Sequence, residues 1–192
     1  MPLARFGDRI VFFVHIPKTG GASIDHYLAA HGAVALWTSG GQGWSKCSPQ
    51  HIHAAIYDRM VPRGFADAAF TILRNPLTRL ISEYRYRKAR RGLDTEFDAW
   101  ALRALAKRAR DPYALDNHLR PQHEFIRDDL TVFRFEDGLD RVFDWIDGQA
   151  GVQRTERPWA NKASGDPVVP GAETEALIRD LYAEDFKLWE GL

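Results

Sequence analysis

The stretch from residue 10 to residue 21 constrains the fold of this chain more than any other. Residues 10–16 form a continuous β-branched and aromatic run, which predicts a strand buried on both faces of a parallel sheet. Gly20 and Gly21 follow directly, and apolar residues at helical spacing then predict a helix to about His31. The sequence therefore begins with a strand, a glycine-rich turn and a helix, the first half of an α/β unit.

The same alternation continues along the chain. Further buried strands are expected at residues 68–73 and 130–135, and a short one at residues 33–37. Proline at the first helical position marks helix starts at Pro49 and Pro76. The remaining helices are expected at residues 97–109, 114–126, 139–146 and 173–189. Strands alternating with helices predict a three-layer α/β fold with a central parallel sheet flanked by helices.

The length and charge of the chain limit what it can be. Its 192 residues suit one domain, residues 1–192, with a single core. The formal net charge is zero, which argues against nucleic acid or an anionic membrane surface as partner. A single cysteine, Cys47, forms no internal disulfide, and no transmembrane segment or signal peptide is evident. We expect a cytoplasmic protein, and the sequence does not specify an oligomeric state.

Positive charge is nevertheless concentrated in one segment. Between Arg74 and Arg91 the sequence has seven basic residues and a single acid, Glu83. A basic segment in a neutral protein is expected at a site for a small polyanion. Arg79 is ambiguous within it, since an ion pair with Glu83 four residues later is as plausible as contact with a ligand.

The turn after the first strand has the composition of a phosphate site. Two glycines allow the backbone to approach an anion, and the following helix presents unpaired N–H groups at its N-terminus. Lys18, Thr19 and Ser23 add a charge and two hydroxyl groups. The turn differs from the nucleoside-triphosphate loop G-x-x-x-x-G-K-[ST], because here the lysine precedes the glycines. The predicted nucleotide-binding residues of this turn are Pro17, Lys18, Thr19, Gly20, Gly21, Ala22 and Ser23.

Two motifs together resemble a known family. Residues 15–23, His-Ile-Pro-Lys-Thr-Gly-Gly-Ala-Ser, resemble the 5′-phosphosulfate loop of sulfotransferases, in the form found in the heparan sulfate O-sulfotransferase group. Arg74, Pro76, Arg79, Ser82 and Tyr84 resemble the family's 3′-phosphate motif, R-x-P-x-x-R-x-x-S-x-Y. Weaker similarities at residues 134–137 and 182–186 extend the resemblance over nearly the whole chain.

The resemblance implies a P-loop NTPase-like fold and a reaction. The donor would be 3′-phosphoadenosine 5′-phosphosulfate (PAPS), and the products adenosine 3′,5′-bisphosphate and a sulfated hydroxyl of a carbohydrate or other acceptor, with no metal required. Arg74 and Ser82 would hold the 3′-phosphate, since a guanidinium binds two oxygens and a hydroxyl a third. Lys162 and Ser164 lie where family members close over the nucleotide.

Catalysis needs a positive charge at the leaving phosphate and a base for the acceptor proton. Lys18 can supply the charge. The resemblance places the base between the two nucleotide motifs, where the sequence offers His51 and His53, with His51 the first choice. His15, in the buried strand, is expected to be a core residue.

The acceptor site is less specified. The middle of the chain is where the family binds acceptors, and polar side chains there suit sugar hydroxyls, although an exposed helix surface would look the same. The candidates are Asn117, His118, Arg120 and Gln122. Six tryptophans would suit sugar stacking, but Trp100, Trp145 and Trp189 occupy helical core positions. Related enzymes are usually longer, so acceptor-binding insertions are in doubt.

Three alternatives remain open at this point. A small-molecule kinase would need magnesium ligands and a lysine after the glycines, and it has no use for a 3′-phosphate site. A non-catalytic nucleotide-binding protein would not need Lys18 together with a candidate base. A zinc site would have to draw its ligands from His51, His53, His118 and His123.

Overall fold

The computed structural model describes residues 1–38, 43, 45–152, 157 and 167–192. Its centre is a five-stranded sheet in the order β3-β1-β2-β4-β5. Strands β2 (Arg9–Val14), β4 (Ala68–Leu73) and β5 (Thr131–Arg134) run parallel to one another. The predicted α/β fold with a parallel centre is confirmed.

The edge of the sheet differs from the prediction. An additional strand, β1 (Leu3–Phe6), pairs antiparallel with β2 and with β3 (Ala33–Ala35). The sequence analysis missed β1, because four residues with an exposed arginine in the middle give no strong strand pattern. The sheet is therefore mixed, with its parallel part at β2, β4 and β5.

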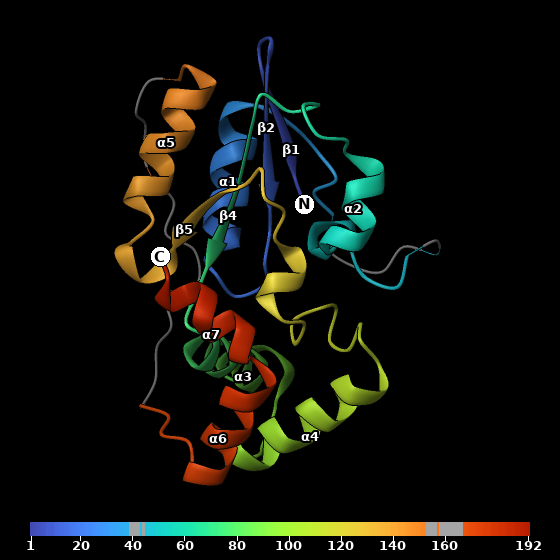
Figure 1. Ribbon diagram of the computed structural model, residues 1–192, viewed down its shortest axis with the longest axis vertical. Helices are drawn as coiled ribbons and strands as arrows, with labels where there is room; N and C mark the ends of the chain where they lie inside the picture. Colours follow the sequence, from blue (N-terminus) through green and yellow to red (C-terminus); the bar gives the residue numbers. More distant parts are fainter. Residues whose placement is uncertain (39–42, 44, 153–156, 158–166) are drawn as a thin grey trace.

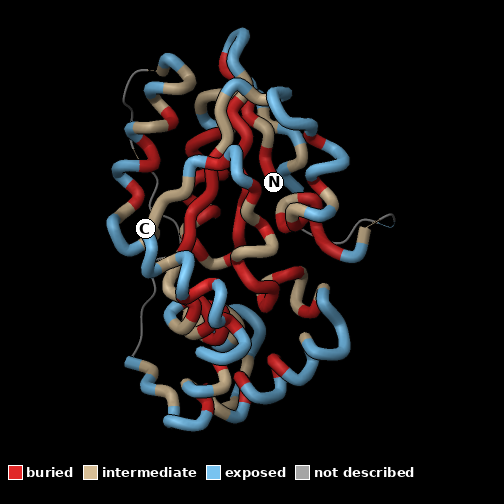
Figure 2. Tube along the Cα trace, viewed as in Figure 1, coloured by how far each residue is buried: buried red, intermediate tan, exposed pale blue. Residues whose placement is uncertain are grey.

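Helices cover both faces of the sheet because successive strand residues point to opposite sides. Val11 and Phe13 pack with α1 (Gly21–His31) and α5 (Asp140–Ala150). Phe12 and Val14 pack with α2 (Ala54–Met60) and the 3₁₀ turn η2 (Gln122–Phe125) on the other face. Figure 2 shows the buried residues running along the central strands between these layers.

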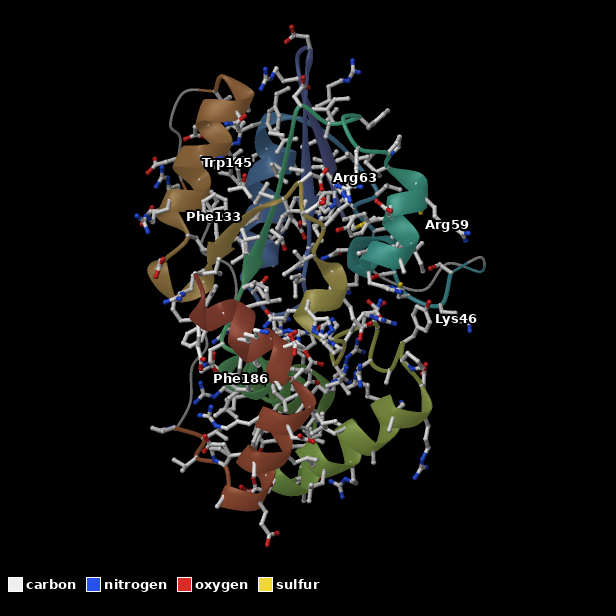
Figure 3. All side chains as sticks on the ribbon, in the orientation of Figure 1. Lys46, Arg59, Arg63, Phe133, Trp145 and Phe186 are labelled. Carbon is white, nitrogen blue, oxygen red and sulfur yellow. The ribbon has the colours of Figure 1, made fainter. Side chains whose placement is uncertain are left out.

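Aromatic contacts join β5 to the helix beside it. The rings of Phe133 and Trp145, labelled in Figure 3, lie 5.7 Å apart at an edge-to-face angle, and both pack around Phe70 of β4. Trp145 is thus a packing residue, as expected. Such aromatic pairs stabilise a core beyond the area that they bury.

A second group of helices lies beyond the carboxyl ends of β2, β4 and β5. It comprises α3 (Pro76–Arg91), α4 (Phe97–Arg110), α6 (Ala172–Leu181) and α7 (Ala183–Glu190), which share one apolar cluster (Figure 1). The single C-terminal helix predicted over 173–189 is in fact two helices, which meet at Tyr182. The Tyr182 hydroxyl donates to the carbonyl of Leu119 at 2.7 Å. The described residues include no helix with the length and apolar character that a membrane crossing requires.

Two further helix predictions were wrong, and both concern segments that contain predicted site residues. The helix expected to start at Pro49 is a 3₁₀ turn, η1 (Pro49–His51), followed by extended backbone at Ile52 and His53, before α2 begins. The break lets Ile52 enter the core, where it is fully buried. The proline at 49 therefore starts one turn and not a long helix.

The helix expected over 114–126 does not form either. Leu115, Asp116 and Asn117 have φ values of 57°, 60° and 63°, in the left-handed region. Such backbone costs an L-residue about 1 kcal/mol or more, although Asn and Asp tolerate it best. The turn survives because Asn117 is anchored: its side chain donates to the His51 carbonyl at 2.8 Å and accepts from Arg120 at 3.0 Å.

Candidate active site

The glycine-rich turn joins β2 to α1 at the carboxyl end of the sheet. Gly20 caps α1 with φ 89°, and Lys18 also has positive φ at 71°. The Thr19 hydroxyl donates to the Ile16 carbonyl at 2.9 Å and closes the turn. The Ser23 N–H already donates to the Gly20 carbonyl at 3.0 Å. The N-terminus of a helix nevertheless carries partial positive charge, so this end of α1 can bind an anion.

The two glycines are required by close packing. A Cβ at Gly21 would overlap the imidazole of His15, and a Cβ at Gly20 would meet the ring of Phe135 at 3.0 Å. Two contacts hold the His15 ring in place, because its Nδ1 lies 2.9 Å from the Asp25 carboxylate and 3.1 Å from the Gln50 amide. The sequence analysis identified the two glycines but explained the need for them only by the approach of an anion to the backbone.

Two arginines hold the carbonyl side of the turn. Arg79 is 3% exposed, and its guanidinium donates to the carbonyls of Pro17 at 2.9 Å and His118 at 3.0 Å. Glu83 pairs with Arg87 and His118, so the ion pair considered for Arg79 does not form. Contact of Arg79 with a ligand stays a prediction. Arg74 donates to the Lys18 carbonyl at 3.2 Å.

Arg74 lies at the end of β4, beside the turn. Its guanidinium stacks on Phe135 at 4.4 Å, and burial lowers its pKa. The Gln122 side chain fixes its backbone, accepting from the Arg74 N–H at 3.0 Å and donating to its carbonyl at 2.7 Å. The Asn75 side chain caps α3 by accepting from the N–H groups of Leu77 and Thr78. Ser82 is partly exposed two turns into α3, on the face that also carries Asn75 and Thr78.

Lys18 reaches from the turn to the side of α3. Its ammonium group lies 4.2 Å from the ring centre of Tyr86. Burial lowers its pKa, while the nearby Glu83 carboxylate acts in the opposite direction. Glu83 is fully buried and accepts from Arg87 and from Nδ1 of His118, both at 2.6 Å. Although burial would raise the pKa of Glu83, His118, Arg87 and Lys18 hold it below its usual value.

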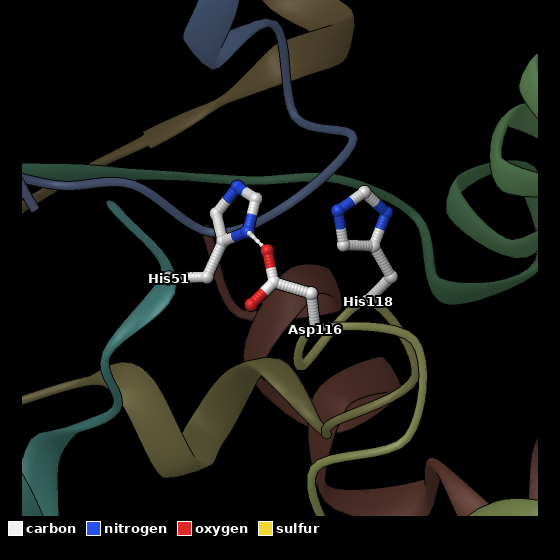
Figure 4. A group of neighbouring side chains, drawn as sticks. All are labelled: His51, Asp116 and His118. Carbon is white, nitrogen blue, oxygen red and sulfur yellow. Dashed lines mark hydrogen bonds and ion pairs between the residues drawn. The ribbon is translucent and has the colours of Figure 1, made fainter. Parts of the chain in front are cut away.

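His51 lies at the end of η1 and faces a carboxylate from the left-handed turn. Its Nδ1 contacts Oδ2 of Asp116 at 2.8 Å. A dashed line marks this contact in Figure 4. Ser48 supports that carboxylate, donating from its hydroxyl at 2.8 Å and from its backbone N–H at 2.6 Å. The His118 ring lies beside them, 4.9 Å from the His51 ring. Asp116, absent from the predicted site, is thus a central member of it.

The charge states of this pair follow from its surroundings. Burial lowers the pKa of His51, more than its hydrogen bond to Asp116 raises it. Burial would raise the pKa of Asp116, but the hydrogen bonds from His51 and Ser48 hold it at about 2. Because an ionised carboxylate only accepts, Nδ1 of the neutral His51 is the donor, and Nε2 carries the lone pair. That nitrogen can accept a proton.

The other predicted site residues have different surroundings. His53 precedes α2, and its ring packs edge-on against Tyr113 at 5.7 Å, outside the His51 cluster. Asn117, Arg120 and Gln122 are buried, and the contacts described above are with protein groups, so their role in binding an acceptor stays a prediction. Lys162 and Ser164 lie outside the described residues.

A metal could use part of the same cluster. His51, Asp116 and His118 place three possible ligand atoms within 4.8 Å of one another. In the structure Nδ1 of His51 contacts Asp116, and Nδ1 of His118 contacts Glu83. Of the four histidines considered for zinc, only these two belong to the cluster, since His53 and His123 are not part of it.

Some functional candidates had no clear signal in the sequence. Asp116 and Glu83 are isolated acids within segments that were predicted to be helices, and only the fold brings them to His51 and His118. A pattern did exist for Glu83, the one acid in a basic segment. Its burial among cations was the part that the sequence could not show.

Two comparisons with known proteins found similarity over most of the chain. A sequence profile described as "Sulfotransferase family" matches residues 4–190. A solved structure, described as the crystal structure of a sulfotransferase from Alicyclobacillus acidocaldarius, aligns over 94% of each chain with 16% identity and a TM-score of 0.49. No curated protein matches the chain.

Proposed function

Because the chain belongs to the sulfotransferase family, we propose that it transfers the sulfuryl group of PAPS to a hydroxyl of a carbohydrate acceptor. The observation that supports this most directly is the convergence of three parts at the carboxyl end of the sheet. These are the anion-binding turn with Lys18, the arginine at the end of β4, and a neutral His51 oriented by Asp116.

The donor would occupy the turn and the end of β4. The N–H groups at the start of α1 and the Lys18 ammonium suit the 5′-phosphosulfate. Arg74 and Ser82 suit the 3′-phosphate, because a guanidinium offers paired donors to two oxygens and the hydroxyl offers one more. The contact of Arg74 with the Lys18 carbonyl supports this arrangement, since it holds the two halves of the donor site together.

The chemical step would be an in-line displacement at sulfur. Nε2 of His51 accepts the proton of the acceptor hydroxyl while the acceptor oxygen bonds to sulfur. The bond between sulfur and the 5′-phosphate oxygen breaks, and its electron pair leaves with the phosphate. Lys18 stabilises the charge that develops there. The products are a sulfated acceptor and adenosine 3′,5′-bisphosphate.

The donor assignment can be tested by thermal shift. Adenosine 3′,5′-bisphosphate should raise the melting temperature far more than AMP or magnesium-ATP at equal concentration, since a ligand stabilises the native state it binds. Arg74→Ala should remove the preference over AMP. Equal shifts with AMP would refute the 3′-phosphate site, and a larger shift with magnesium-ATP would favour the kinase alternative.

Activity requires a separate test. Incubation with PAPS and a panel of glycans should yield a product heavier by one SO₃ group in mass spectra, together with adenosine 3′,5′-bisphosphate. Binding of the nucleotide with no product from any glycan or simple alcohol would support the non-catalytic alternative.

A further inference from the structure

A cavity of about 420 Å³ lies beside α1, and Ala22 is the one lining residue that it shares with the proposed donor site. Ala22 of the glycine-rich turn lies in its wall, as does Gln50, which precedes His51 in the chain. Its size falls within the range of about 300–1,000 Å³ typical of small-ligand sites. The residues that line it are Ala22, Asp25, His26, Trp37, Thr38 and Gln50.

Asp25 lines this cavity, and one oxygen of its carboxylate has no hydrogen-bond partner among the described residues. Asp25 is 2% exposed, and its Oδ2 contacts His15 at 2.9 Å and Gln50 at 3.1 Å. Oδ1 is buried without a hydrogen-bond partner among the described residues. Buried carboxylate oxygens normally have donors, so this atom indicates a group that the structure does not contain. A ligand hydroxyl would supply the missing donor.

An aromatic side chain borders the same cavity. Trp37 is 39% exposed, unlike the tryptophans at core positions, and its ring stands edge-on to His26 at 6.2 Å. An exposed indole offers an apolar face of the kind on which a sugar ring can stack, and its N–H can also donate. An apolar face beside an acceptor for hydroxyls suits a polyhydroxylated ring.

The charge of Asp25 restricts which ring would fit. A ring with a carboxylate or sulfate group would place a second negative charge near a buried one, which is unfavourable in a medium of low polarity. A ring that carries only hydroxyl groups satisfies Oδ1 without that repulsion.

We propose that this cavity is the acceptor subsite and that it takes an uncharged sugar ring, stacked on Trp37 with a hydroxyl donating to Oδ1 of Asp25. The inference rests on the proposed function and makes it more specific, because it selects neutral over acidic sugars. It also assigns a role to Trp37 and Asp25, which the sequence analysis did not include in the site.

The test is saturation-transfer NMR with methyl glycosides of glucose, galactose and glucuronic acid, on protein saturated with adenosine 3′,5′-bisphosphate. At least one neutral glycoside should bind, and the glucuronide should bind at least tenfold more weakly. Trp37→Ala should weaken the neutral glycoside about tenfold or more. Asp25→Asn should weaken it too and should reduce the discrimination against the glucuronide. Phe65→Ala is the matched control, because Phe65 is also an exposed aromatic residue but does not line the cavity.

The outcomes separate this inference from the proposed function. Melting-temperature shifts with adenosine 3′,5′-bisphosphate should remain unchanged in Trp37→Ala, which also shows that the variant is folded. If the nucleotide binds but no glycoside does, or if the glucuronide binds as tightly as the neutral sugars, the subsite is refuted while the donor assignment stands. Unaltered glycoside binding in Trp37→Ala would refute it as well. Glycoside binding without any response to the nucleotide would instead contradict the proposed donor.

Discussion

Nδ1 of His51 donates to Oδ2 of Asp116 at 2.8 Å, although the two residues are 65 positions apart in the chain. The contact joins the end of η1 to a left-handed turn that follows α4. It fixes the tautomer of the imidazole, so that Nε2 is the nitrogen able to accept a proton. Asp116 would therefore act on the reaction through His51, as a positioning residue.

Asp116→Asn should lower kcat by about 10²-fold, the lower end of what a positioned general base contributes. The amide can donate to Nδ1 and so favour the wrong tautomer. The KM for PAPS should change little, because the described contacts of Asp116 are with Ser48 and His51 and not with the donor site. Asp128→Asn serves as control, since Asp128 is an exposed acid paired with Arg63. Equal activity of the two variants would remove Asp116 from the mechanism.

His51→Ala should lower kcat by about 10²- to 10⁴-fold while leaving nucleotide binding intact. His53→Ala should retain most activity, because His53 packs against Tyr113 and not against Asp116. Steady-state kinetics with PAPS and melting curves with adenosine 3′,5′-bisphosphate measure the two effects separately. The opposite result, an inactive His53→Ala, would exchange the two roles, and full activity of both would place the base elsewhere.

The pH dependence of kcat should have an acid limb below pH 6.5. The base must be neutral, and burial lowers the pKa of His51 from 6.5, so activity is lost only as the pH falls through that lowered value. An alkaline limb should begin below pH 10.5, because burial also lowers the pKa of Lys18, which must stay charged. A rate profile of the wild type checks both. An acid limb above pH 6.5 would mean that His51 is not the titrating base.

Lys18→Ala should lower kcat more than it weakens donor binding, since the ammonium matters most as the leaving phosphate gains charge. Lys18→Arg keeps the charge but not its position, and should recover only part of the activity. Comparing kcat with the dissociation constant of adenosine 3′,5′-bisphosphate separates the two effects. A variant with weaker binding and normal kcat would make Lys18 an anchor only.

The part of the site that is local in sequence could be predicted. The turn from Pro17 to Ser23 and the start of α3 at Pro76 follow from adjacent residues, since strand pattern, glycine and capping signals act over a few positions. The three parallel strands were found for the same reason, although β5 was expected to be buried and its residues are exposed or only partly buried. Their hydrophobic runs are long enough to exclude other assignments of secondary structure.

The part of the site that depends on contacts between residues distant in the sequence could not be predicted. The left-handed backbone at Leu115 to Asn117 is maintained by bonds to His51 and Arg120, so the helix-like pattern of residues 114–126 gave a wrong result. The interruption after His51 depends on burial of Ile52 in the core. Because of these two errors, the sequence analysis did not place Asp116 next to His51. With a continuous helix, His51 and His53 would have pointed in opposite directions, whereas the structure separates them by a break in the helix.

Gly21→Ala should destabilise the protein by about 1–3 kcal/mol, the range for overpacking a filled site, and should abolish the thermal shift with adenosine 3′,5′-bisphosphate. The added Cβ would overlap the His15 imidazole, which Asp25 and Gln50 hold in place. Gly148→Ala is the matched control: nothing lies within 4 Å of a Cβ in this exposed part of α5, so alanine should stabilise the helix by about 0.5–1 kcal/mol. Denaturant unfolding of both variants measures the expected loss of stability in Gly21→Ala and the expected gain in Gly148→Ala.

A second substitution tests whether the imidazole is the cause. His15→Ala in the Gly21→Ala background removes the ring that the Cβ would meet. The double variant should therefore lose less stability than the sum of the two single changes, a coupling expected of residues in direct contact. Strictly additive losses would show that Gly21 is needed for its backbone freedom at the start of α1 and not for the space that it leaves to His15.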